Sequence, residues 1–183
     1  MTVRKIVLYR ENEAALRKKS EPVRVINRRV KKLIKDLKET LLANSNGIGL
    51  AAPQINVHLR VIAVRLGGRG DGESEPGPPL IIINPEIIEA GEDRRDFDGC
   101  LSFPGLFAET VRPHYLRLTG LDEQGQPFDH RFEDFDAVLV HHEIDHLDGV
   151  LFIDRVAKIE DLYRLREDEN GELVRVPVTL EGI

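Results

Sequence analysis

The sequence contains only one cysteine, Cys100, in 183 residues. An intramolecular disulfide needs two cysteines, so we exclude a disulfide-stabilised fold and expect a reducing compartment, by default the cytoplasm. No apolar run approaches the roughly 20 residues that a membrane-spanning helix requires, and we therefore expect no membrane insertion. The apolar run within the N-terminal MTVRKIVLYR is too short for a signal peptide, and a Ser-rich, acid-poor transit peptide is also missing.

Positive charge is in the minority. The 26 Lys and Arg residues face 32 Asp and Glu residues, which gives a net charge of -6. This balance argues against nucleic-acid binding through a general basic surface, although a locally basic face in transient contact with the ribosome stays open. A hydrophobic content of 41% with 32% charged residues is typical of a soluble globular protein. The length suits a single domain with a substantial core, so we expect one α+β domain over residues 1–183.

Hydrophobic periodicity predicts one amphipathic helix in the N-terminal part of the chain. Apolar residues recur at helical spacing from Ile26 to Leu41, with Lys and Arg between them. We expect this helix to start near Asn27 and to end before Asn46. The polar segment 10–22, by contrast, predicts a loop with at most one helical turn.

Strands are expected in the centre and at the end of the chain. Segments rich in residues that favour β-structure predict strands at residues 57–66, 80–89 (interrupted at Pro85) and 173–180. The same signal predicts a hairpin of residues 112–120 with 127–132 and an extended segment at 151–156. A mobile surface loop is expected at about 67–79, where Gly, Pro and acidic residues gather, and a C-terminal tail at about 157–183. We therefore expect antiparallel sheets around a central helix, which is described next.

The stretch from Asp134 to Gly149 reads DFDAVLVHHEIDHLDG and contains an H-E-x-x-H pattern. On a helix, His142 and His146 lie on one face, where both can bind the same metal ion. Glu143 lies about 100° further round, close enough to reach a water on that metal without being a ligand.

This helix is expected to be buried nearly all round. Apolar side chains share the histidines' face (Phe135, Val138, Leu139) and fill the opposite side (Ala137, Val140, Ile144, Leu147), which leaves a narrow polar strip of Asp134, His141, Asp145 and Asp148. We expect Asp134 or Asp136 to be the N-cap and Gly149 to stop the helix.

The H-E-x-x-H pattern alone leaves the nature of the site open. Two partly exposed histidines on a core helix would give the same pattern, and a metal site needs a third protein ligand and an open position. No third histidine follows six residues after His146, so the metzincin pattern fails. A downstream glutamate has candidates only in the polar region 160–172, outside any clear second helix.

Cys100 is the other soft ligand available. A lone cysteine in a cytosolic protein is usually an apolar core residue. Here it follows Gly99 and precedes Leu-Ser-Phe-Pro-Gly, a turn-rich segment unlike a core strand. A thiolate with two neutral imidazoles suits Zn²⁺, Fe²⁺, Co²⁺ or Ni²⁺, and the sequence does not choose among them.

Three motifs occur together in the chain: GIGLAAPQ at 47–54, DGCLS at 98–102 and HHEIDHLDG at 141–149. In this combination the chain resembles the peptide deformylases, metalloenzymes that remove the formyl group from the N-terminal methionine of new polypeptides. The resemblance spans roughly residues 20 to 156. It implies that Cys100, His142 and His146 bind the metal, typically Fe²⁺, with Zn²⁺ or Ni²⁺ able to take its place.

The resemblance also implies a mechanism for the remaining motif residues. Water activated at the metal with Glu143 as general base attacks the formyl carbon, and Glu143 then passes the proton to the leaving amine. The side-chain amide of Gln54 and the backbone N–H of Leu101 stabilise the charge that builds on the formyl oxygen.

The same resemblance implies where the substrate lies. The backbone edge at Ile48 and Gly49 is expected to pair with the substrate as an added strand. We expect Ile48, Leu101 and Val138 to line the methionine pocket.

Two positions depart from the family pattern. Asp98 stands where the family usually has Glu, and a carboxylate one methylene shorter must still reach Arg112 and the residues behind the metal. His141 stands where Gln is common, and its angular position on the helix predicts a residue behind the site or on the surface.

Two rival functions stay open. A metallopeptidase that cuts internal peptide bonds would share the helix and the activated water. A deformylase-like protein that binds without turnover would share the ligands, although the presence of Glu143 and Gln54 argues against it.

Overall fold

The computed structural model describes residues 2–68 and 75–178, which contain three α-helices and seven strands. Their order is α1 (Tyr9–Arg17), α2 (Arg28–Ala43), β1 (Gly49–Ala51), β2 (Val61–Val64), β3 (Leu80–Gly99), β4 (Phe107–Leu121), β5 (Pro127–Glu133), α3 (Asp134–Leu147), β6 (Leu162–Glu167) and β7 (Leu173–Pro177). Residues 69–74 of the expected loop at 67–79, and the end of the expected strand at 173–180, lie outside the described residues. None of the described helices has the length and apolar character of a membrane-spanning helix.

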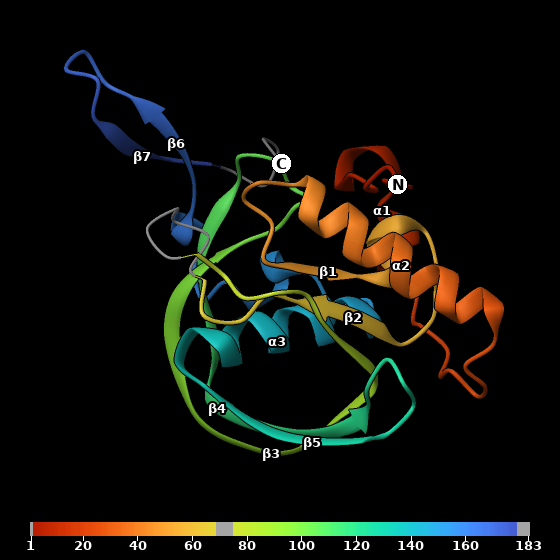
Figure 1. The fold of residues 1–183 in the computed structure, drawn as a ribbon. Coiled ribbons are helices and arrows are strands. Elements are labelled where there is room, and N and C mark those ends of the chain that lie inside the picture. The colour runs from red at the N-terminus through yellow and green to blue at the C-terminus, as the bar shows by residue number, and fades with distance from the viewer. Residues whose placement is uncertain (1, 69–74, 179–183) are drawn as a thin grey trace.

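The seven described strands form one antiparallel sheet around α3. Its order is β1-β2-β3-β4-β6-β7, with β5 pairing with β4 outside this path. Figure 1 shows β3, β4 and β5 curving around one side of α3, while β1 and β2 lie on its other side. The expected α+β fold, with antiparallel strands around a central buried helix, is confirmed.

The helix expected near residues 27–46 is α2. The Asn27 side chain accepts hydrogen bonds from the backbone N–H groups of Arg29 (3.0 Å) and Val30 (3.1 Å), which fixes the start of the helix. Its buried apolar face packs against β1 and β2 and forms one core cluster with Leu50 and Val61. This prediction is confirmed at both ends.

The prediction for residues 10–22 was wrong, because this segment contains α1. The helix is interrupted at Asn12, which has non-helical backbone angles, and it buries only Ala15 and Leu16. Leu16 packs in a cluster with Phe103 and Phe152. Two buried residues give too weak a periodicity to identify a helix in such a polar segment.

The strand expected at 80–89 is the beginning of β3, which continues to Gly99. The expected interruption at Pro85 is present as an irregularity, since the register with β4 shifts between Ile83 and Glu86. Asn84 adopts a positive φ of 52° there, and its side chain makes two hydrogen bonds with the backbone of Val23 (2.8 and 2.9 Å). The strand continues through polar residues because β4 pairs with it along its length.

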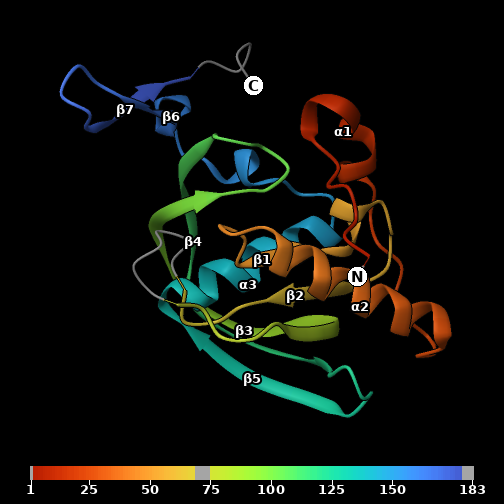
Figure 2. The ribbon, with the colours of Figure 1, turned by 45° about the horizontal axis from the view of Figure 1, so that its top comes forward.

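The C-terminal part of the chain differs in two respects from the expectation. Residues 152–155 form a 3₁₀ turn rather than an extended segment, since the Asp154 carboxylate accepts the Leu151 N–H at 2.8 Å. β6 was not expected; it pairs with β7 in a hairpin that projects from the body of the molecule (Figures 1 and 2). The hairpin of β4 with β5 follows the sequence prediction.

Candidate metal centre

The α3 helix is buried along almost its whole length, as its sequence predicts. The predicted N-cap was wrong: Glu133 occupies this position and makes no side-chain cap. Asp134 instead accepts a hydrogen bond from Arg94 (3.0 Å), and Asp136 accepts the N–H of Gly67 (3.0 Å). The helix start is therefore held by contacts with β3 and the 67–68 segment rather than by a local cap.

The other end of α3 is fixed by Gly149, as expected. Gly149 has a φ of +74°, and a Cβ atom there would lie 2.1 Å from the Arg17 carbonyl oxygen. Only glycine combines this backbone conformation with such a close approach. The helix therefore ends where α1 and its following residues pass over it.

Cys100, His142 and His146 come together at the centre of the fold. One potential ligand atom from each residue lies within 4.8 Å of the other two, and the described residues contain no second such group of three. The Cys100 Sγ atom lies 3.3 Å from His146 Nε2. These three residues are the ones that the sequence predicts as metal ligands.

Local structure places each of the three side chains. His142 and His146 are one helical turn apart on α3, with ring centroids separated by 5.0 Å. Cys100 follows β3 directly and begins a turn in which its carbonyl accepts the Phe103 N–H at 2.9 Å. The turn-rich sequence after Cys100 thus brings the thiol towards α3.

Asp98 orients His142. One carboxylate oxygen lies 2.7 Å from His142 Nδ1, so that Nε2 is the nitrogen directed at Cys100 and His146. The other oxygen accepts hydrogen bonds from Thr110 Oγ1 (3.0 Å) and Arg112 Nε (2.8 Å). Burial raises the pKa of Asp98, but His142 and Arg112 lower it more, and the pKa lies well below its usual range. The shorter carboxylate therefore reaches both partners.

Arg112 continues this network behind α3. Its guanidinium is fully buried and donates to Asp145 (2.8 Å), which also accepts two hydrogen bonds from Arg155 (2.7 and 3.0 Å). His141 Nδ1 lies 2.8 Å from Arg112, and burial lowers the pKa of His141 to about 4. A neutral His141 can accept from Arg112, which places it behind the site, as its angular position predicts.

Sequence reasoning missed the extent of this network. Arg155 was not identified, and Arg112 was considered only as a partner of Asp98. The available signal was the polar strip of α3, because a buried carboxylate such as Asp145 requires a cation nearby.

Glu143 lies in the same cavity with an unusual environment. Its side chain is buried and its Oε2 atom has no hydrogen-bond partner among the described residues. Burial raises the pKa of Glu143 to about 7. A carboxyl group that gains and loses a proton near neutral pH is suited to general acid–base chemistry.

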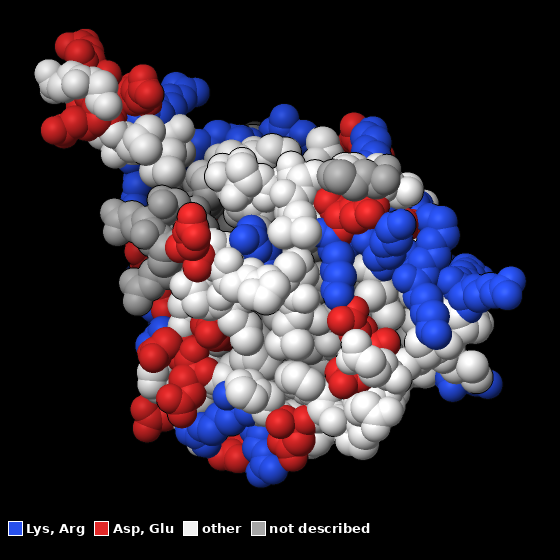
Figure 3. Space-filling model, in the orientation of Figure 1, with Lys and Arg blue, Asp and Glu red and all other residues white. Residues whose placement is uncertain are grey.

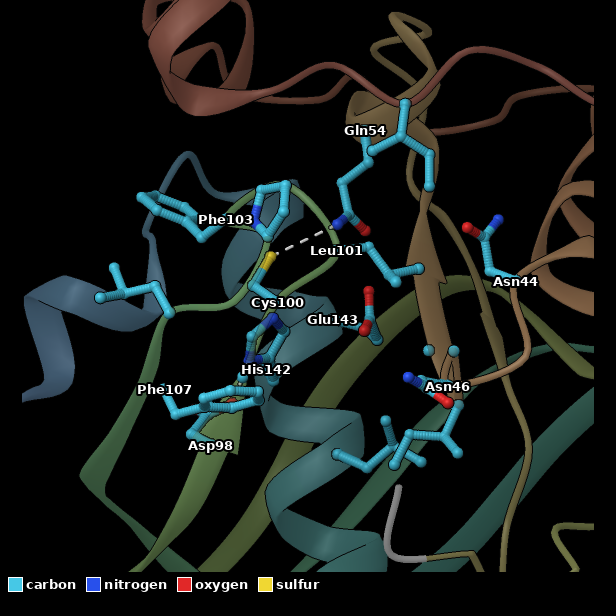
Figure 4. A pocket seen from close by; sticks show the side chains of 18 of the residues that line it. Asn44, Asn46, Gln54, Asp98, Cys100, Leu101, Phe103, Phe107, His142 and Glu143 are labelled. Carbon is cyan, nitrogen blue, oxygen red and sulfur yellow. Dashed lines mark hydrogen bonds and ion pairs between the residues drawn. The ribbon is translucent and has the colours of Figure 1, made fainter. Parts of the chain in front are cut away.

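Gln54 presents its amide nitrogen to the metal centre. Its Oε1 accepts the Ala51 N–H at 2.8 Å, which fixes the orientation of the amide. Its Nε2 then lies 3.5 Å from Cys100 Sγ and 3.2 Å from Ser102 Oγ (Figure 4). The N–H groups of Gln54 therefore point at the space beside Cys100.

One cavity of about 500 Å³ joins these groups. Its lining contains the predicted catalytic residues Gln54, Leu101 and Glu143 and the predicted ligands Cys100 and His142. The predicted substrate-binding residues Ile48, Gly49 and Val138 line it as well. Other lining residues were not indicated by the sequence, among them Asn44, Asn46, Phe97 and Phe107. His146 lies behind His142 and is 1% exposed. The structure thus brings all the predicted site residues together.

The donor set fits a divalent transition metal. It offers one sulfur and two imidazole nitrogens, a combination typical of Zn²⁺, Fe²⁺, Co²⁺ or Ni²⁺. The orienting contact from Asp98 to His142 is the arrangement that usually supports a histidine ligand. The cavity borders Cys100 and His142, so open space adjoins two of the three ligand residues, as catalysis at a metal requires.

Comparisons with known proteins agree with this geometry. The family model described as polypeptide deformylase matches residues 3–161. The chain is 39% identical over 168 residues to the peptide deformylase of Acetivibrio thermocellus (90% of this chain, 93% of the relative) and 42% identical over 154 residues to that of Aquifex aeolicus (84% and 88%).

Solved structures show the same similarity. The peptide deformylase from Thermotoga maritima is 33% identical with a TM-score of 0.75, covering 86% of this chain and all of that one. The peptide deformylase from Ehrlichia chaffeensis in complex with actinonin is 35% identical with a TM-score of 0.76, covering 86% and 91%. A family match over most of the chain, the shared fold and a metal centre with its acid and amide in one cavity lead to one conclusion: the chain belongs to the polypeptide deformylase family.

Proposed function

We propose that this deformylase removes the formyl group from N-terminal formylmethionine on newly made polypeptides. The residues of the metal centre would carry out this hydrolysis of the formyl amide bond. The observation that carries the proposal is the single cavity shared by Cys100, His142, Glu143 and Gln54. Water adds to the formyl carbon, the C–N bond breaks, and formate and a free amino terminus are released.

Cys100, His142 and His146 would hold one divalent metal ion, which we assign as Fe²⁺, with Zn²⁺, Ni²⁺ or Co²⁺ able to occupy the same site. When bound, such an ion lowers the pKa of water and polarises a carbonyl oxygen.

Glu143 serves as the general base and then as the general acid. Its unpartnered oxygen and its pKa near 7 support this role, since the carboxylate can accept the proton of the attacking water and return it to the leaving nitrogen. No other titratable side chain that lines the cavity, among the described residues, is free of a fixed ion pair or ligand position.

Gln54 and Leu101 stabilise the charge on the formyl oxygen. The Gln54 amide is held by Ala51 so that its N–H groups face the space beside Cys100, and the Leu101 N–H follows the thiol directly. Removal of one such donor typically lowers the rate by ~10²–10³.

The substrate peptide binds along β1 as an added strand. β1 is the terminal strand of the described sheet order, so its second edge can pair with an extended peptide. Gly49 lies in this strand beside Glu143, and Ile48, Leu101 and Val138 provide an apolar pocket for methionine.

We place the protein in the cytoplasm, where its free thiol would stay reduced, with nascent polypeptide N-termini as its partner. A transient ribosome contact through the basic side chains that gather over α2 (Figure 3) belongs to the same proposal. Co-sedimentation of the protein with ribosomes that weakens as salt rises would support this contact; no co-sedimentation at low salt would contradict it.

Formate release from a formyl-Met peptide tests the function directly. We expect stoichiometric formate and a free methionine amine. Cleavage of unformylated peptides at internal bonds, with the formyl peptide untouched, would instead identify a metallopeptidase. A metal-loaded protein that binds the formyl peptide but never releases formate would be a binding protein.

Metal identity is tested by anaerobic purification, metal analysis and exposure to peroxide. If the native ion is Fe²⁺, air or peroxide should inactivate the native enzyme faster than the Ni²⁺-loaded enzyme, because Ni²⁺ is not readily oxidised. Equal lifetimes would contradict the assignment of iron.

A further inference from the structure

The mouth of the cavity has two walls of different chemistry. Asn44 and Asn46 provide amides on one side, and Phe97 and Phe107 provide aromatic rings on the other. Figure 4 shows Phe107 and Asn46 on opposite sides of Glu143. None of these four residues has a role in the proposed chemical step.

The ring of Phe107 covers the backbone beside the thiol. A Cβ atom built on Gly99 would lie 3.0 Å from Phe107 Cδ1, so the ring packs directly against the residue before Cys100. Phe97 stacks on Phe107 with a centroid distance of 5.5 Å and an interplanar angle of 27°. Both side chains are half-buried, which leaves part of each ring open to the cavity.

The C-terminal hairpin supports this aromatic wall from behind. Phe107 on β4 pairs in register with Tyr163 on β6, and their ring centroids are 6.1 Å apart. Arg175 on β7 lies over the Tyr163 ring at 4.5 Å from its centroid. The hairpin, which the sequence did not fully predict, therefore fixes the position of Phe107.

The charged side chains that line the cavity are acidic. Among the described residues that line it, the charged groups are Asp98 and Glu143, and lysine and arginine are missing. An acidic substrate side chain would meet no cationic partner among these lining residues, while an apolar or aromatic one would pack on the two rings.

We propose that Phe107, together with Phe97, is a specificity-determining residue that favours an apolar or aromatic side chain at one of the two positions after methionine. This inference rests on the proposed deformylase function. Side chains of an extended peptide alternate between its two faces, so only one of the second and third positions faces the aromatic wall.

The test measures kcat/KM for formate release from two peptide series. Formyl-Met peptides carry Gly, Phe or Asp at the second position, or the same residues at the third. At one position we expect Phe to exceed Gly by about threefold to tenfold and Asp to be the poorest. The Phe-to-Gly ratio should fall towards one in Phe107→Ala and should be retained in Phe107→Tyr.

Two further variants keep the test decisive. Phe97→Ala removes the second ring of the wall and should also lower the Phe-to-Gly ratio. This variant tests the inference even if Phe107→Ala does not fold properly. Phe128→Ala is the matched control: Phe128 is a half-buried aromatic residue on β5 that packs with His130 and Phe132 outside the cavity lining. The control should leave the ratio unchanged.

The outcomes separate this inference from the proposed function. Formate release without a preference at either position, or with a preference that survives both Phe107→Ala and Phe97→Ala, would overturn the inference alone. No formate from any of the peptides would contradict the deformylase function itself.

Discussion

At the scale of single residues, hydrogen bonds decide which atoms of the metal centre are available. Asp98 binds the Nδ1 side of His142 at 2.7 Å, and Ala51 binds the oxygen of the Gln54 amide at 2.8 Å. Each contact leaves the opposite nitrogen directed at the cavity. The orientation of both side chains is therefore fixed by contacts on the side away from the cavity.

Replacement of Glu143 by alanine should abolish turnover but preserve the metal. The variant lacks the group that moves the proton, and kcat/KM should fall by ~10²–10⁴. Formate release and metal content, measured on the same preparation, test this. Simultaneous loss of metal would show that Glu143 is a ligand or a structural residue.

Replacement of Cys100 by serine should lower metal binding sharply. A hydroxyl does not provide the thiolate that holds a transition metal, so the metal-to-protein ratio after gel filtration should fall by roughly tenfold or more. An unchanged metal content would remove Cys100 from the site.

Asp98→Asn should weaken metal binding without removing a proposed ligand. Loss of the orienting charge on His142 is expected to lower metal affinity by ~10–100-fold. Loss of one of the two carboxylates that face the fully buried Arg112 should also lower the free energy of unfolding. The loss should be smaller than the roughly 3–5 kcal/mol typical of leaving a buried charge unpaired, because Asp145 still accepts a hydrogen bond from Arg112.

The control for Asp98 is Asp129→Asn. Asp129 pairs with Arg117 at 2.8 Å on the exposed surface, where an ion pair contributes little. Metal affinity should stay the same in this variant. An equal loss in both variants would show that net charge, rather than orientation of His142, controls binding.

At the scale of elements, the site depends on the close approach of β1 to α3. A Cβ atom on Gly49 would lie 2.1 Å from Glu143 Oε1 and 2.7 Å from Leu139 Cδ1. Gly49 of the GIGLAAPQ segment is therefore required by packing between these two elements, in addition to any contact with substrate.

Gly49→Ala should displace Glu143 and lower kcat/KM by about 10²-fold, the size of effect that a misplacement near 1 Å can produce. Gly77→Ala is the control, since its Cβ would meet only the Leu66 carbonyl at 3.4 Å, an ordinary contact. Steady-state kinetics of both variants decide the point. Comparable activities would show that Glu143 adapts to the added methyl group.

At the scale of the whole molecule, the metal centre connects segments that are distant in sequence. Cys100 follows β3, the histidines belong to α3, and Gln54 follows β1. That all 183 residues form one catalytic domain stays a prediction, because the ends of the chain lie outside the described residues.

Removal of the metal should therefore destabilise the entire fold. A metal present at 100 to 1,000 times its Kd stabilises the native state by about 3–4 kcal/mol. For a chain of this size the loss corresponds to a decrease in Tm of roughly 10 °C, measurable by calorimetry with and without chelator. Restoration of Tm by added metal is the control, and an unchanged Tm would place the metal outside the folded core.

The sequence by itself determined the elements with a strong local signal. His142 and His146 share a face only if their segment is helical, and their spacing therefore predicts α3. The apolar periodicity of α2 and the glycine that ends α3 are likewise signals carried by residues close together in the sequence. The resemblance to the family left open whether the shorter carboxylate of Asp98 reaches Arg112, and the contact of 2.8 Å shows that it does.

Tertiary structure decided what depends on contacts between distant segments. α1 buries only Ala15 and Leu16, and Leu16 packs against Phe103 and Phe152, so its position depends on contacts that a hydrophobic period does not reveal. The aromatic wall exists because β6 returns from the C-terminal region to place Tyr163 beside Phe107. Local periodicity carries no information about such pairings, and the part of the site that faces the substrate beyond methionine could therefore be found only in the folded molecule.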